Sequence, residues 1–155
     1  MKSVWLYRIS AMILVLFGAG HTYGFLSFRA PTMEGRAVWD AMNHVPLPVG
    51  GQSLTYGGFY TAFGLDISLY LFFSAFLAWH LSVQSRRAPQ TIGALASGFV
   101  ALQVGGLALS WIYFGPIQVA FGAIVAGCLA WAVLALPKTA PASEKLAELS
   151  GSLHK

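Results

Sequence analysis

Apolar residues are concentrated in four long segments of this 155-residue chain, with polar residues between them. The segments run from about Trp5 to Phe28, Gly57 to Leu81, Thr91 to Phe114, and Pro116 to Leu136. Each is close to or longer than the ~20 residues that a helix needs to cross the hydrocarbon core of a bilayer. The pattern therefore predicts an all-α fold, in which residues 1–136 form one bundle of four transmembrane helices.

Three connections and a tail join and follow these segments. The longest is the loop from Arg29 to Tyr56, in which the stretch Pro31 to Asn43 is expected to form a short helix at the membrane surface. A short basic loop is expected over Ser82 to Gln90, and a tight turn at Gly115. Residues 137–155 are expected to form a polar tail.

Composition and charge support a membrane location and indicate an orientation. The chain is 57% hydrophobic and 9% charged, whereas soluble domains contain about 25% charged residues. Basic residues of short loops favour the cytoplasmic side. If both termini and the tail are in the cytoplasm, two of the nine Lys and Arg residues lie on the outer side and the other seven on the inner side. This orientation is therefore expected, and it places the long first loop outside the inner (cytoplasmic) membrane. The inner residues are Lys2, Arg8, Arg86, Arg87, Lys138, Lys145 and Lys155, and the outer ones are Arg29 and Arg36.

Asp66 is a carboxylate inside the second segment, where a charge costs about 2.5–3.5 kcal/mol on insertion scales. Counting about 100° per residue, it lies nearly opposite a seam of small residues that is expected to pack on a neighbouring helix. The seam comprises Gly57, Thr61, Gly64, Ser68, Ala75, Ala78 and Ser82, and the Asp66 face includes Phe59, Phe63, Tyr70 and Phe73.

Small residues also predict the packing faces of the other segments. The expected contacts are Gly18 with Thr22 and Gly20 with Gly24 in the first segment, Gly93, Ser97, Ala101 and Ala108 in the third, and Gly122, Ala126 and Ala130 in the fourth.

His21 and Asp66 are expected at the same depth. At 1.5 Å per residue, both fall roughly 6–8 Å to the outer side of the midplane on consecutive antiparallel helices. A hydrogen bond between them would lower the cost of burying each. These two are the candidate catalytic residues, and the predicted ligand-binding set around them is His21, Tyr23, Tyr60, Asp66, Tyr70, Gln103, Ser110 and Gln118. The same polar layer is also compatible with a structural network that sets the helix register.

Several chemistries are not expected from this sequence. His80 lies about 20 Å along the axis from Asp66, too far inward to share one haem iron with His21. Cys128 is the single cysteine, which excludes an intrachain disulfide. The chain has no Gly-rich phosphate loop, HExxH or GxSxG motif. We therefore expect neither a cofactor nor a metal, and no nucleic-acid partner.

The run from Gly18 to Gly24, with Gln52-Ser53, Phe59-Tyr60 and Gly64, resembles small bacterial four-helix integral membrane proteins without an assigned activity. The resemblance extends from about Ile9 to Leu136. It implies the four-helix architecture and draws attention to His21, and it implies no particular reaction.

Three functions remain open, and whether the protein is an enzyme is open with them. The first is the binding of an apolar or amphiphilic small molecule, of lipid or quinone type, in a pocket in the outer half of the membrane. The second is a structural or accessory subunit that packs against other membrane helices, including a second copy. The third is a small oligomeric proton-coupled carrier.

Overall fold

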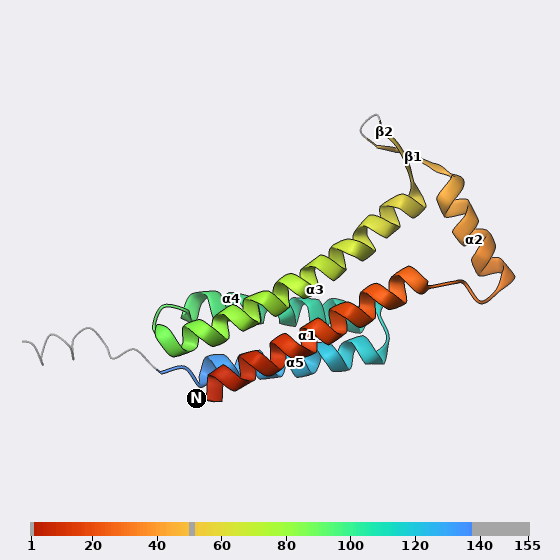
Figure 1. Ribbon diagram of the computed structural model, residues 1–155. Helices are drawn as coiled ribbons and strands as arrows, with labels where there is room; N and C mark the ends of the chain where they lie inside the picture. The colour runs from red at the N-terminus through yellow and green to blue at the C-terminus, as the bar shows by residue number, and fades with distance from the viewer. Residues whose placement is uncertain (1, 50–51, 138–155) are drawn as a thin grey trace, which may run out of the picture. The chain divides into compact units, whose positions relative to one another are not determined.

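The computed structural model describes residues 2–49 and 52–137, and the predicted polar tail lies outside the described residues except for Pro137 (Figure 1). Four of its helices are long and apolar enough to span a membrane, as predicted. They are α1 (Lys2–Ser27), α3 (Tyr56–Arg87), α4 (Gly93–Tyr113) and α5 (Pro116–Leu134). The protein is therefore a multi-pass membrane protein with an all-helical membrane domain.

The long loop contains a helix and a hairpin. The expected short helix is present as α2 (Met33–His44), and the Thr32 side chain caps it by accepting a hydrogen bond from the Gly35 N–H at 3.0 Å. The hairpin of β1 (Pro46–Val49) and β2 (Gln52–Thr55) was not predicted. Its prolines resemble loop signals, but both strands of a two-stranded sheet are edge strands, where proline is tolerated. Figure 1 shows this hairpin beyond the end at which α3 begins.

Helix α3 is longer than its apolar segment, so the predicted loop from Ser82 is wrong. At its start, the Thr55 side chain accepts a hydrogen bond from the Gly58 N–H at 3.0 Å. At its end, Ser82 and Ser85 are buried, and Arg86 and Arg87 occupy the last turn. Basic side chains there are favourable because their positive charges are attracted to the negative end of the helix dipole.

The chain divides into two compact units. The first, Ile9–Trp79, contains most of α1, helix α2, the hairpin and most of α3. The second contains the first two turns of α1, the last two turns of α3, and helices α4 and α5. The predicted site residues are distributed over both units.

Helices α1 and α3 meet through the predicted small-residue seam. Gly64 and Ser68 are buried, and a Cβ added at Gly64 would overlap the ring of Phe25. Gly18 lies under Phe72, with 3.2 Å between its hypothetical Cβ and Cε1 of that ring. A phenylalanine of each helix thus packs on a glycine of the other.

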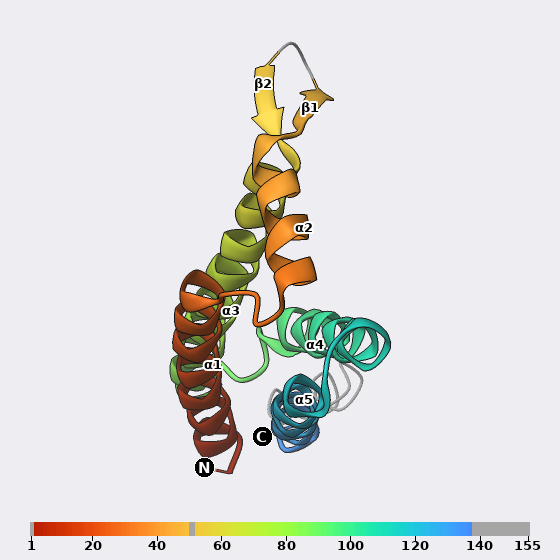
Figure 2. The same ribbon diagram turned by 90° about the vertical axis from the view of Figure 1, so that its right-hand side faces the viewer.

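Helices α4 and α5 pack against each other on either side of the Gly115 turn (Figure 2). On α5, Gly122 lies beside Leu107 of α4, 3.3 Å from Cδ1 to a hypothetical Cβ, and Ala126 is buried as expected. The prediction for α4 was wrong, because its buried residues are Ala96, Phe99 and Gln103. The predicted contact residues Ser97, Ala101 and Ala108 are exposed instead. The small residues of α5 accept larger side chains from α4, so α4 needs no small-residue face of its own.

Replacing Gly64 with alanine is expected to destabilise the first unit, Ile9–Trp79, by about 1–3 kcal/mol, the usual cost of overpacking. The matched control is Gly20→Ala, since Gly20 has no atom within 4 Å of a hypothetical Cβ. Alanine is the better helix former, so this control should leave stability unchanged or raised. The free energy of unfolding in mixed micelles measures both effects. Equal effects of the two substitutions would contradict the close contact, whereas partial rescue of Gly64→Ala by Phe25→Ala would support it.

Candidate functional site

His21, Thr22 and Ser68 form a hydrogen-bonded cluster between α1 and α3. His21 Nδ1 lies 3.1 Å from Ser68 Oγ, and Thr22 Oγ1 lies 2.9 Å from the same oxygen. Thr22 also donates to the Gly18 carbonyl at 2.7 Å. The pattern of small residues predicts Ser68 only as a member of the packing seam, and that seam is the signal in the sequence that brings Ser68 close to the first helix and His21.

One nitrogen of the His21 ring is not used by the cluster. Ser68 has one hydroxyl proton, and its oxygen lies 2.9 Å from Thr22 Oγ1, 3.1 Å from His21 Nδ1 and 3.4 Å from the Gly64 carbonyl. Whether His21 Nδ1 donates or accepts follows from the tautomer of the ring. Nε2 has no hydrogen-bond partner among the described residues. The half-buried imidazole can therefore form one further hydrogen bond through Nε2.

A chain of aromatic rings connects this cluster with the outer loop. His21 stacks on Phe25 with centroids 5.9 Å apart, and Phe25 lies 5.5 Å from the ring of Tyr60. Tyr60 meets Trp39 of α2 edge-on at 5.9 Å, and Trp39 lies 6.5 Å from Phe28. The rings fix the position of α2 against the ends of α1 and α3 and restrict the rotation of His21.

Asp66 does not join the cluster, which corrects the expected His21–Asp66 hydrogen bond. It is exposed, and its carboxylate has no hydrogen bond or ion pair within the described part of the chain. The expected common level of His21 and Asp66 along the two helices agrees with the structure, since His21 contacts Ser68 and Asp66 lies two residues, or about 3 Å along the axis, from Ser68. The two residues point in nearly opposite directions because two residues correspond to about 200° of helix rotation.

The remaining predicted site residues do not form one pocket. Tyr23 is 77% exposed on α1, Tyr60 belongs to the aromatic chain, and Tyr70 is half-buried on α3. The other three belong to the second unit, so no contact with His21 is assigned to them. They are Gln103, which is buried on α4, and the half-buried Ser110 and Gln118.

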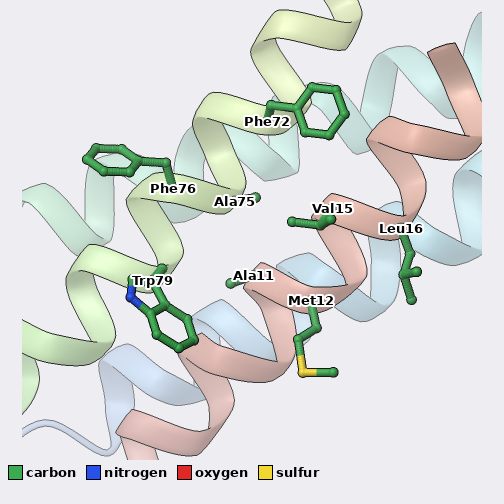
Figure 3. A pocket seen from close by; sticks show the side chains of 8 residues that line it. All are labelled: Ala11, Met12, Val15, Leu16, Phe72, Ala75, Phe76 and Trp79. Carbon is green, nitrogen blue, oxygen red and sulfur yellow. The ribbon is translucent and has the colours of Figure 1, made fainter.

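An apolar groove with a volume of about 540 Å³ lies between α1 and α3. Ala11 and Ala75 are buried, whereas the larger side chains around them are exposed, which leaves a groove along the helix pair (Figure 3). Eight apolar residues line it, and none of them was predicted as a site residue from the sequence. They are Ala11, Met12, Val15, Leu16, Phe72, Ala75, Phe76 and Trp79.

A smaller cavity of about 230 Å³ lies where the outer loop leaves α1. It is lined by two basic residues, one acidic residue and two aromatic rings. Arg29 already donates to the Phe28 carbonyl at 2.8 Å, and Arg36 Nε to the Thr32 carbonyl at 3.4 Å. The lining residues are Phe28, Arg29, Ala30, Arg36, Trp39 and Asp40.

Within residues 2–49 and 52–137, no three His, Cys, Asp or Glu side chains are grouped as a metal site requires. His44 Nδ1–H donates to the Asp40 carbonyl, 2.7 Å away, and His80 lies 3.4 Å from the Gln84 amide nitrogen. Comparisons of the chain with protein families, curated proteins and solved structures find no match.

Removing the Ser68 hydroxyl tests the energetic role of the cluster. Ser68→Ala is expected to lower the free energy of unfolding by roughly 0.6 kcal/mol and at most about 1.7, the range for hydrogen bonds between membrane helices. A double-mutant cycle with His21→Phe should show a coupling energy of similar size. Ser97→Ala, on the exposed surface of α4, is the control and should have no effect. Additive effects of Ser68→Ala and His21→Phe would exclude a stabilising hydrogen bond between these residues.

Proposed function

We propose that this protein binds an apolar or amphiphilic molecule of lipid or quinone type, with its hydrocarbon chain in the α1–α3 groove. The observation that supports the proposal is the groove itself, whose 540 Å³ are lined by apolar side chains alone. In a bilayer the affinity for the ligand comes from the fit of its hydrocarbon chain in the groove. Removal of water contributes little, because the lipid tails that the ligand leaves are as apolar as leucine. Closely fitting side chains gain dispersion energy over loosely packed lipid.

The polar cluster supports an amphiphile over a plain hydrocarbon. Along α1, His21 lies five residues beyond Leu16, or about 7.5 Å. Along α3, Ser68 lies four residues before Phe72, or about 6 Å. A ligand whose carbonyl group is next to the start of its chain therefore reaches both regions. In this proposal Ser68 donates to His21 Nδ1, and His21 Nε2–H donates to the ligand oxygen.

The groove proposal predicts one saturable site beside Trp79. With 5-fluorotryptophan in the full chain, titration with a short-tail benzoquinone or a diacyl phosphatidylglycerol should shift the resonance that Trp79→Phe removes. Val15→Phe partly fills the groove and should weaken binding by about ten-fold or more, or about 1.4 kcal/mol. Leu102→Phe, at an exposed position of α4, is the matched control and should bind as the wild type does.

His21→Phe separates the two parts of the proposed ligand site. It should weaken binding of the quinone by about five- to ten-fold, the value of one hydrogen bond, and leave a hydrocarbon without oxygen unaffected. Failure of every ligand to shift the Trp79 resonance at saturating concentration would refute small-molecule binding in the groove.

We further propose that the protein lies in the inner (cytoplasmic) membrane of a bacterial cell with both termini in the cytoplasm. The support is the distribution of basic residues, with Arg29 and Arg36 alone on the outer side. Fusion of green fluorescent protein to the C-terminus should give fluorescent cells, and alkaline phosphatase fused after Asn43 should be active. The opposite pair of results would reverse the orientation.

A further inference from the structure

The Asp66 face of α3 has the spacing of a helix-packing seam. Phe59, Phe63, Asp66, Tyr70 and Phe73 follow one another at intervals of four, three, four and three residues. This is the heptad pattern of positions that insert between the side chains of a neighbouring helix. Three of its members are large and exposed, with Phe59 at 48%, Phe63 at 56% and Phe73 at 63%.

The opposite face of α3 already has its neighbour. The small-residue seam at Gly64 and Ser68 contacts α1, so the same helix carries a second, differently built seam that faces away from this contact. Asp66 is exposed in that second seam within a membrane-spanning helix, and no described residue donates to it. Ionisable side chains in membranes are almost always paired and mark functional sites.

We propose that the Asp66 face of α3 binds a membrane helix of another protein that carries one basic or amide side chain level with Asp66. Charge complementarity indicates this partner, since a lone carboxylate is stabilised by a donor and best by a cation. A second copy fits less well, because a parallel symmetric dimer on this seam would bring two Asp66 carboxylates to the same level. A single polar position within an apolar heptad also sets the register of the two helices.

The shape of the seam specifies the rest of the partner. Phenylalanine side chains at three of the five positions need recesses on the facing helix. The protein already packs its rings in this way, with Phe25 on Gly64 and Phe72 on Gly18. The partner helix is therefore expected to present glycine, alanine or serine opposite the rings and one Lys, Arg, Asn or Gln opposite Asp66.

Cross-linking to synthetic helices tests the proposal in phosphatidylcholine vesicles. The full chain carries Cys128→Ser and Phe63→Cys. The probes are leucine–alanine transmembrane peptides with one cysteine, and they differ only in having Lys or Leu at the level of Asp66. Disulfide formation with the Lys peptide should be about ten-fold more efficient than with the Leu peptide. Asp66→Leu should reduce this preference to within about two-fold, and Asp66→Asn should give an intermediate value.

Two controls make the result specific. Leu65→Cys is also exposed but lies about 100° around the helix from Asp66, so it should cross-link weakly to either peptide. Asp66→Leu changes an exposed position outside the groove, so its far-UV circular dichroism and the ligand response of Trp79 should match the wild type. The outcome for ligand binding in the groove is therefore independent of the outcome for helix binding at the Asp66 face.

Two results would overturn the proposal. One is that the Phe63→Cys chain that retains Asp66 cross-links equally to the Lys and Leu peptides. The other is efficient cross-linking of Phe63→Cys chains to each other without peptide, persisting on dilution in lipid, which would assign this face to a second copy.

Discussion

The close contact of α1 and α3 is the interaction on which the other features of the first unit depend. Water is absent from the bilayer core, so helices there associate through packing and hydrogen bonds instead of the hydrophobic effect. Gly64 permits the approach by leaving room for the Phe25 ring, and Ser68 adds hydrogen-bonding contacts with His21 and Thr22. Once this face of α3 is committed to α1, the orientation of its remaining side chains follows from helix geometry.

That contact has two consequences for function. Ala11 and Ala75 continue the small-residue contact toward Trp79, and the larger side chains around them leave the apolar groove between the helices. On the other side of α3, Asp66 is exposed with the rings of Phe59 and Phe63. The proposed ligand site and the proposed helix-binding face therefore use different surfaces of one helix.

Much of the fold could be predicted because it depends on local properties of the chain. The length of an apolar segment identifies a membrane span, and small residues identified the face of α3 that packs on α1. The extension of α3 to Arg87 and the β1–β2 hairpin were missed, because polar residues and prolines resemble loop signals when their hydrogen bonding is unknown. The predicted packing face of α4 was wrong because Gly122 and Ala126 of α5 already provide the small residues at the contact between these two helices.

The sequence by itself determined the membrane spans, the similar depth of His21 and Asp66, and the opposition of Asp66 to the small-residue seam. Depth and relative angle within one helix follow from a rise of 1.5 Å and a turn of about 100° per residue, which need no knowledge of a neighbour. Only the tertiary structure decided that His21 bonds to Ser68 and that Asp66 is exposed. Those outcomes depend on how α1 and α3 are rotated about their axes, and packing between helices sets that rotation.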